Sequence, residues 1–367
     1  MSSGGISQLV AIGAQDAFLI GDPQVSFFQS AYKHHTNFSQ VVDTQVLQGN
    51  STSGGMSTVR FQRNGDMMGF VYITGTWSNG GVQTAYTTQN WSNVIDHVEL
   101  YIGGQLIDRQ SSEFTEFLAP DIFAQNLSKS SVGSVHSGYG TQSYFYPLRF
   151  WFCENWQSAL PLVALQYHDV EIRIYWSSTL STNATSGGDS CAPGSIINFE
   201  VYTQYIFLDT MERKFMTDKT HTLLINQVQY MSPTNSPNMP IVFNHPIKYL
   251  CATPGTAITS NLTSASNKLL IQINGTDIAD FKFACPNFTG VQSYYYAPFS
   301  IGNDNAFFLF SFCLDTSKFQ PTGTLNFSRL DSVRIVSQSG NIRNTVYAVN
   351  YNILKIQNGM GGLMYSN

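Results

Sequence analysis

The histidines and acidic residues are the side chains here that could do acid–base or metal chemistry, but their spacing builds no recognised site. His34-His35 and His168-Asp169 are the points richest in histidine. A metal site there would need ligands from distant segments, and a packed or capped histidine is the interpretation we favour for His168. Nothing singles out a glycosidase pair among the 23 Asp and Glu residues. Walker, HExxH, GxSxG, EF-hand and GxGxxG motifs are absent, so we expect no enzyme, no catalytic residue, no cofactor and no metal site.

Asparagines in Asn-x-Ser/Thr sequons could carry glycans. In a chain this rich in Asn, Ser and Thr many sequons arise by chance, and only those in exposed loops are plausible acceptors. The first residues lack the basic segment of a signal peptide, so modification would need a non-standard enzyme. The candidate acceptors are Asn126, Asn183, Asn261 and Asn287.

The five cysteines are odd in number and form no CxxC pair. This spacing indicates neither a disulfide framework nor a zinc knuckle. Several cysteines lie in apolar strands, such as Cys313 at the end of a Phe-rich run. We therefore expect buried free thiols and a reducing compartment.

Charge is scarce and mildly negative, at 11% charged residues and a net charge of −5. Phosphate binding needs clustered Lys and Arg, which the 18 basic residues do not provide, so we expect no direct nucleic-acid contact. No apolar run approaches the length of a membrane span. The many aromatic residues, with 26 Phe, 19 Tyr and 5 Trp, are typical of an all-β protein with polar loops and exclude a disordered chain.

A short pattern occurs twice, half the chain apart. Val98–Ile107 (VELYIGGQLI) and Leu269–Ile278 (LLIQINGTDI) superpose their apolar positions when Gly103-Gly104 is set over Asn274-Gly275. Both pairs suit the positive-φ turns that match strand twist, so each copy predicts a β-hairpin. Chance could produce one such echo, but a true duplication would make the chain two similar β domains in tandem.

The strand pattern supports two all-β domains of about 170 to 180 residues each. Val170–Trp176 alternates cleanly, as half-buried antiparallel strands do. We expect a short helix over Ser112–Gln125 that is interrupted at Pro120, and a helix start at Asp209 that separates the domains. The predicted organisation is an N-terminal arm (1–35), a first jelly roll (36–209), a short helical linker (210–222) and a second jelly roll (223–367).

The second half of the sequence shows the same pattern of predicted strands joined by loops. A strand is expected over Ile241–Cys251, and Phe288–Asp304 is expected to be a long aromatic loop. With about eight strands in each half, the fold class is all-β, two tandem eight-stranded antiparallel jelly rolls. Long polar loops are expected at Asn126–Gln142, Ser177–Ser195 and Pro254–Asn267.

Ordered segments along nearly the whole chain resemble the major capsid proteins of nucleocytoplasmic large DNA viruses, the double jelly-roll family. The longest segment with a strong family signature is Leu160–His168 (LPLVALQYH). The other similar segments are Leu9–Asp16, Gly21–Phe28, His35–Phe38, Phe150–Cys153, Tyr205–Asp209, Phe243–Pro246, Gln320–Arg329, Asn350–Lys355 and Gly361–Asn367.

The resemblance implies a structural protein that forms homotrimers, which act as pseudo-hexameric capsomers and tile an icosahedral virion shell against neighbouring capsomers. It also implies assembly in the host cytoplasm, outward-facing loops, and an N-terminal arm that contacts minor capsid proteins beneath the shell. This chain is shorter than many relatives, so its outer loops are expected to be trimmed.

Other hypotheses remain open from the sequence. The chain could be a minor capsid paralogue at a vertex or spike, or a carbohydrate-binding jelly roll for host attachment. The second would need an aromatic platform, for which Tyr294-Tyr295-Tyr296 is the visible candidate, although subunit packing explains the same tyrosines. A β-sandwich glycosidase would need a paired-carboxylate cleft.

Overall fold

The computed structural model separates residues up to Asn37 from Phe38–Asn367, and each unit is described by itself. The first unit carries two short helices, α1 (Ser3–Val10) and α2 (Ala17–Ile20), and leaves most of its apolar side chains exposed. The residues described are 3–79, 82–86, 88, 90–126, 129, 143–180, 196–253, 261–300 and 307–365.

The first sandwich of the second unit packs a six-stranded sheet against a five-stranded sheet. In the six-stranded sheet, β1, β11 and β4 follow one another and β8 pairs with the far edge of β4, where β5 and β9 also pair. The other sheet has the order β2-β3-β10-β6-β7. The strands are β1 (Phe38–Gln45), β2 (Leu47–Gly49), β3 (Met56–Arg60), β4 (Met67–Asn79), β5 (Val82–Ala85), β6 (Ile95–Ile102), β7 (Gln105–Ser111), β8 (Phe145–Pro147), β9 (Leu160–Pro161), β10 (Val170–Trp176) and β11 (Ile196–Leu208).

The second sandwich repeats this design with the sheets β12-β21-β14-β18 and β13-β20-β15-β16. The short strands β17, β19 and β22 pair with β15, β14 and β21. The strands are β12 (His221–Met231), β13 (Asn238–Ile241), β14 (Pro246–Ala252), β15 (Lys268–Ile273), β16 (Thr276–Asp277), β17 (Lys282–Phe283), β18 (Phe308–Ser311), β19 (Leu325–Asn326), β20 (Val333–Ser337), β21 (Val346–Gln357) and β22 (Met360–Leu363).

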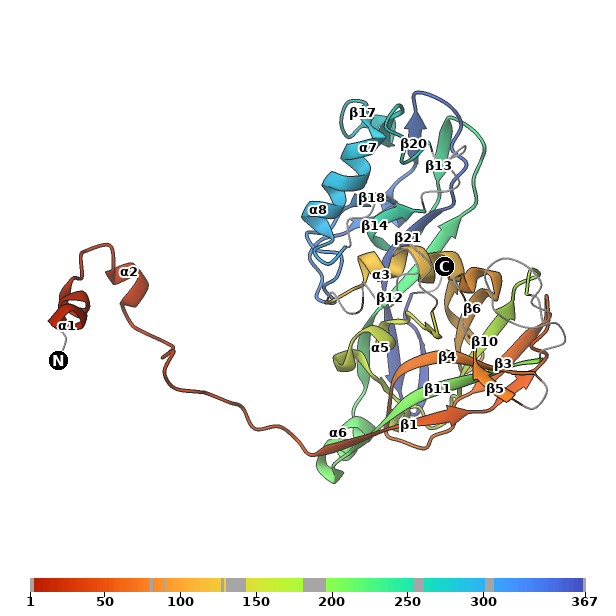
Figure 1. Ribbon diagram of the computed structural model, residues 1–367, viewed down its shortest axis with the longest axis horizontal. Helices are drawn as coiled ribbons and strands as arrows, with labels where there is room; N and C mark the ends of the chain where they lie inside the picture. The colour runs from red at the N-terminus through yellow and green to blue at the C-terminus, as the bar shows by residue number, and fades with distance from the viewer. Residues whose placement is uncertain are drawn as a thin grey trace. The chain divides into compact units, whose positions relative to one another are not determined.

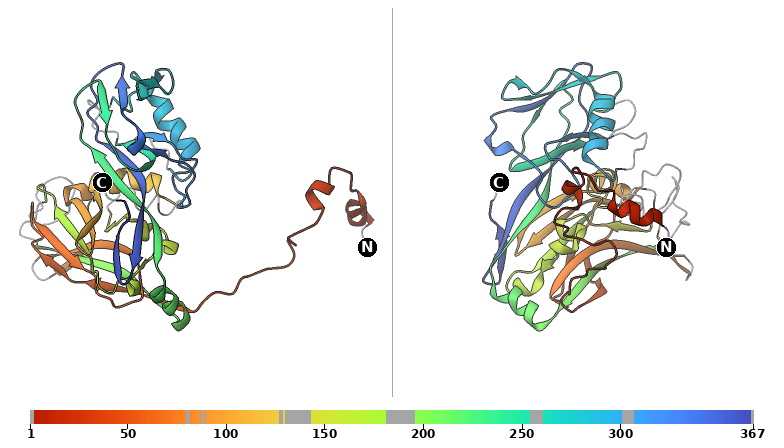
Figure 2. Two further views of the ribbon diagram at one scale, coloured as in Figure 1. Left: turned by 180° about the vertical axis from the view of Figure 1, so that it is seen from behind. Right: turned by 90° about the vertical axis from the view of Figure 1, so that its left-hand side faces the viewer.

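Both sandwiches have the same strand connectivity. We set aside the short strands β2, β5, β9, β17, β19 and β22 and number the other eight strands of each sandwich in chain order. In both sandwiches, one sheet then has the order 1-8-3-6 and the other has the order 2-7-4-5. This is the antiparallel jelly-roll order. The predicted double jelly roll is confirmed, and the two rolls are visible in Figures 1 and 2.

Helices occupy two equivalent places, one after the fifth strand of each roll. These are η2 (Phe114–Leu118) with α3 (Ala119–Ile122) in the first roll, and α7 (Ala284–Pro286), η5 (Asn287–Val291) and α8 (Gln292–Tyr296) in the second. The other described helices of this unit lie between the rolls or in connections: η1 (Trp91–Asn93), α5 (Trp151–Glu154), η3 (Trp156–Ser158), η4 (Leu162–Ala164), α6 (Thr210–Asp218) and η6 (Phe327–Arg329). The predicted helix start is confirmed, because the Asp209 side chain accepts a hydrogen bond from Thr210 N at the beginning of α6.

The repeated sequence pattern falls on the same hairpin of each roll. It forms β6–β7 in the first and β15–β16 in the second, each closed by two residues. Gly103 and Gly104 have φ angles of 58° and 80°, and Asn274 and Gly275 have 50° and 78°, as the turn prediction requires. The copies differ at their last apolar position, because Ile278 is 45% exposed whereas its counterpart is buried.

Three local predictions are wrong. The strand expected over Ile241–Cys251 is two strands in different sheets, because the chain turns a corner at His245 (φ 68°) before Pro246. The loop expected from Phe288 is helical through Tyr296, since Phe288 and Thr289 are buried and tertiary packing overrides local propensity. Pro120 does not interrupt its helix, because η2 runs directly into α3 and Pro120 stands in the first turn of α3.

The strand pattern itself holds. β10 alternates buried and half-buried residues along its whole length, as its sequence predicts. The loops expected at 126–142, 177–195 and 254–267 lie largely outside the described residues, so their predicted outward position stays a prediction.

Substituting the two turn glycines tests the first hairpin. A Cβ at Gly103 would collide with the His168 ring, whereas a Cβ at Gly104 meets nothing within 4 Å. Gly104→Ala should therefore lower the free energy of unfolding by about 1–2 kcal/mol, the cost of a left-handed alanine, and Gly103→Ala by at least about 1 kcal/mol more. Urea unfolding measures both, and equal effects would contradict this account of the turn.

Candidate assembly surfaces

The contact between the two rolls is an apolar cluster that both rolls build. From the first roll, η2 and α3 lie against the outer face of the six-stranded sheet of the second roll (Figure 1). We call this set the inter-roll cluster. It contains Phe114, Leu118, Ala119, Ile122 and Phe123 of the first roll, and Val228, Tyr249, Cys251, Ala297, Phe307, Leu309, Cys313, Tyr347 and Val349 of the second, all buried.

Strands of the second roll also extend into the core of the first. Ile225 of β12, with Leu354 and Ile356 of β21, belongs to the buried core of the first roll. Because each roll completes the other, the two are one packed body rather than two domains on a flexible hinge.

A buried carboxylate lies where β7 meets β12. Asp108 Oδ1 accepts a hydrogen bond from Val228 N at 2.9 Å, and its Oδ2 accepts from Gln110 Nε2 at 2.8 Å. Burial raises the pKa of Asp108 to about 7, although these donors act in the opposite direction. The contact between the rolls therefore contains a group that titrates near neutral pH.

A second polar link joins the helix start to the far sheet. Glu113 accepts from Thr253 Oγ1 at 2.7 Å and from Tyr347 OH at 3.1 Å. Burial and the nearby Glu113 charge raise the pKa of Tyr347 well above its usual value. These bonds orient Tyr347 beneath Phe114, whose ring lies 5.4 Å away.

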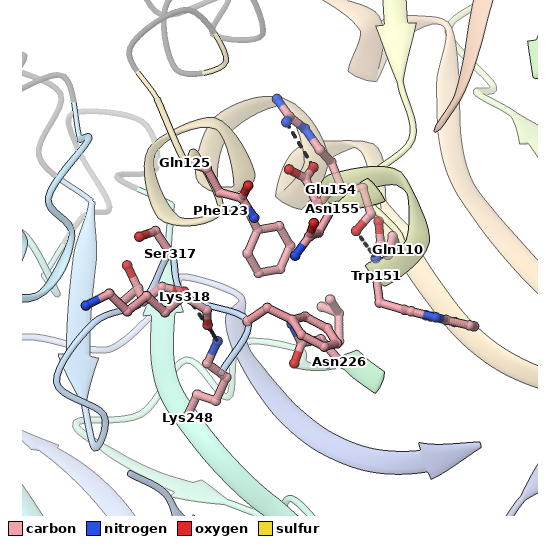
Figure 3. Close-up of a pocket in the computed structure, with 14 residues that line it drawn as sticks. Gln110, Phe123, Gln125, Trp151, Glu154, Asn155, Asn226, Lys248, Ser317 and Lys318 are labelled. Carbon is pink, nitrogen blue, oxygen red and sulfur yellow. Dashed lines mark hydrogen bonds and ion pairs between the residues drawn. The ribbon is translucent and has the colours of Figure 1, made fainter. Parts of the chain in front are cut away.

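A small pocket of about 20 Å³ opens beside this contact (Figure 3). Lys248 Nζ donates to the carbonyl oxygens of Thr316 and Lys318 at 3.3 and 3.2 Å, and burial lowers the pKa of Lys248 to about 8. On the opposite wall, Arg149 Nη1 pairs with Glu154 Oε1 at 3.0 Å. The space suits about one water molecule, so these charges brace loops of both rolls rather than hold a substrate.

The outer face of the six-stranded sheet in the first roll carries an open aromatic groove of about 940 Å³. Tyr72 of β4 stacks on Tyr202 of β11 with ring centroids 5.3 Å apart, and it meets Phe145 of β8 edge-on at 6.1 Å. Phe70 extends this row, and Trp156 at the groove margin is 79% exposed. An exposed aromatic patch of this kind marks an interaction surface.

The sequence-derived glycosylation candidates do not converge. Asn126 is exposed after α3, and its Oδ1 accepts from Lys129 N at 2.9 Å. Asn261 is half-buried and donates to Asn341 O at 2.7 Å, while Asn287 starts η5 and donates to Phe283 O at 3.0 Å. Asn183 lies outside the described residues. Asn126 thus has the most accessible position of the three that can be placed.

The described histidines lie in no cluster that could hold a metal ion. His168 Nδ1 lies 2.8 Å from Gly361 O, so it links the loop before β10 to β22, in keeping with the packed interpretation. Within the described ranges no group of three or more His, Cys, Asp or Glu residues could hold a metal ion. Among those same residues no helix is long and apolar enough to cross a membrane.

Sequence reasoning missed Asp108, Glu113, Lys248 and the aromatic groove. No motif marks these residues, because their roles arise from pairing between strands far apart in the chain. The flagged Tyr294 and Tyr295 are 80% and 70% exposed on α8, with their rings edge-to-face at 5.0 Å. Four cysteines, Cys153, Cys251, Cys285 and Cys313, are free thiols, as expected, but of these only Cys251 and Cys313 are buried.

Two jelly rolls in tandem, fused through a buried face, define the double jelly-roll class of proteins. A family model described as "Major capsid protein N-terminus" matches residues 26–209, and one described as "Large eukaryotic DNA virus major capsid protein" matches residues 252–362. The chain belongs to the major capsid proteins of large eukaryotic DNA viruses, which confirms the resemblance found in the sequence.

Individual relatives agree. The major capsid protein of Pyramimonas orientalis virus is 32% identical over 403 residues, covering 99% of this chain and 100% of that protein. That of Paramecium bursaria Chlorella virus 1 (PBCV-1) is 32% identical over 447 residues, covering 100% of both. A quasi-atomic structure of the PBCV-1 capsid matches with a TM-score of 0.75 at 25% identity, covering 93% of this chain and 100% of that one. These relatives have a structural, non-enzymatic role, in line with the prediction that the chain is not an enzyme.

Asp108→Asn should change how stability depends on pH. Between the usual aspartate pKa of 3.8 and the raised value of about 7, only the unfolded chain ionises this group, so rising pH favours unfolding. As pH rises through this window, the unfolding free energy of the natural chain should fall by up to about 1.4 kcal/mol per pH unit compared with that of Asp108→Asn. Above about pH 7 the difference between the two proteins should stay constant. Urea titrations at several pH values measure the difference, and a pH-independent difference would contradict the raised pKa.

Phe123→Ala tests whether the rolls unfold together. Removing this buried ring should cost about 3–5 kcal/mol, whereas Phe281→Ala, at an exposed phenylalanine, should stay within about 0.5 kcal/mol. All five tryptophans precede residue 177, so tryptophan fluorescence reports the first roll and far-UV circular dichroism reports both. We expect coincident transitions in all three proteins, and fluorescence that unfolds separately would show that the rolls are independent.

Proposed function

We propose that this chain is the major capsid subunit of a large double-stranded DNA virus and acts by self-assembly. Three copies associate into a pseudo-hexameric capsomer, and neighbouring capsomers tile the icosahedral shell of the virion after synthesis in the host cytoplasm. The observation that carries the proposal is the identical strand order of the two rolls, which gives three subunits six similar corners. The PBCV-1 capsid match supports it.

The N-terminal arm fits a role in binding minor capsid proteins. Its apolar side chains, among them Phe18, Phe27 and Phe28, are almost fully exposed within their own unit. A segment of this kind gains stability by ordering on a partner surface. The candidate sequons, Asn126, Asn183, Asn261 and Asn287, are the positions where glycans on the assembled shell should be sought.

Mass measurement of the native assembly in solution tests the proposal. We expect a species of three times the 40.7 kDa chain mass at micromolar concentration. A well-behaved monomer at that concentration would contradict it.

A minor capsid paralogue is the second candidate. The mimivirus "Probable capsid protein 4" is 24% identical and covers 99% of this chain and 99% of its own length. Abundance in purified particles separates the two roles, since a major subunit must be the dominant shell protein.

A further inference from the structure

Each roll has a helical segment after its fifth strand, and the two segments share a design. In the first roll η2 runs directly into α3, and in the second η5 runs directly into α8. Both carry a buried Phe-Thr pair in their first turn, Phe114-Thr115 and Phe288-Thr289. The duplication therefore produced two equivalent helical segments as well as two sandwiches.

Among the described residues, only the first-roll segment packs against the outer sheet face of the other roll. The first-roll segment covers the outer face of the six-stranded sheet in the second roll, where Tyr249 of β14 is buried. The second-roll segment instead leaves Tyr294 and Tyr295 exposed, and Figure 1 shows α8 along one side of the second roll.

Among the residues that the structure describes, no counterpart of η2 and α3 covers the equivalent sheet of the first roll. Its outer face holds the aromatic groove, and Tyr72 of β4 occupies the third jelly-roll strand as Tyr249 does in the second roll. Tyr72 is half-exposed whereas Tyr249 is buried. The exposed face of α8 and the aromatic groove are thus unpaired among the described residues. Each is the counterpart of a surface that is already paired inside the chain, the first of η2 and α3 and the second of the sheet face around Tyr249.

We infer that α8 of one subunit packs into the aromatic groove of the next subunit, with Tyr294 and Tyr295 against Phe70 and Tyr72. This contact rests on the proposed trimer and specifies how it closes. Because the two surfaces differ, the contact is head-to-tail, and repetition of one rotation forms a ring. Three contacts inside chains then alternate with three between chains around the capsomer.

The double variant Tyr294→Asp/Tyr295→Asp tests the helical side. Placing two charges in a desolvated aromatic contact should weaken trimer association at least about tenfold, while the far-UV circular dichroism spectrum of the folded subunit stays unchanged. Tyr167→Asp is the matched control, because Tyr167 is 74% exposed but lies before β10, outside both surfaces. Sedimentation velocity over a concentration series measures the association.

Cross-linking tests the pairing without disrupting it. In a background whose five native cysteines are replaced by alanine, Phe70→Cys and Tyr294→Cys chains, mixed and treated with a short bis-maleimide, should give a covalent product that neither variant alone nor the cysteine-free chain gives. Products from a single variant alone would indicate a symmetric contact and overturn the head-to-tail arrangement. This experiment also decides the matter if the double aspartate variant folds poorly.

The outcomes separate the two proposals. If the natural chain is monomeric, the proposed trimer fails. If it is trimeric but the aspartate variant is equally trimeric and the mixed cross-link is missing, the trimer stands and the α8–groove contact is overturned.

Discussion

Burial of the outer sheet face of the second roll by η2 and α3 is the contact on which the rest of the structure depends. A jelly roll normally keeps its apolar side chains between its two sheets and presents a polar exterior. Here Tyr249, Tyr347 and Val349 make an exterior face apolar, so the second roll requires the first to cover it. The fixed relation of the two rolls follows from that need rather than from the short helix α6 that connects them.

The polar groups at this contact fix the register between the two rolls but lower the stability of the folded chain. Asp108 and Glu113 each accept hydrogen bonds from the other roll, and each would lose its partners if the rolls shifted. A buried carboxylate whose pKa is raised to about 7 opposes folding at neutral pH. Apolar packing supplies the attraction, and these bonds select one register between the rolls.

Much of the fold could be predicted from the sequence, because strand alternation and hairpin turns are local signals. The Gly103-Gly104 and Asn274-Gly275 turns, the face of Val170–Trp176 and the start of α6 all follow from neighbouring residues. The failures are equally physical. The corner at His245 and the helix through Tyr294-Tyr295 depend on packing against distant strands. Nothing in the sequence around Asp108 identifies Val228 as its hydrogen-bond partner. The sequence offered subunit packing as one role of Tyr294 and Tyr295, but the aromatic groove could not be foreseen, because it depends on which sheet face is left uncovered.

The chemistry of the covered and uncovered faces differs in a way that assembly explains. A contact inside one chain is never separated after folding, so Leu118 and Ile122 can be purely apolar and fully buried. A contact between subunits must remain compatible with water until partners meet, which would favour tyrosine, whose hydroxyl stays hydrated while its ring supplies apolar area. Tyr294 and Tyr295 on α8 and Tyr72 in the groove fit that requirement. In the proposed trimer, duplication would give two copies of one contact, and the residues on each copy would differ according to whether it closes during folding or during assembly.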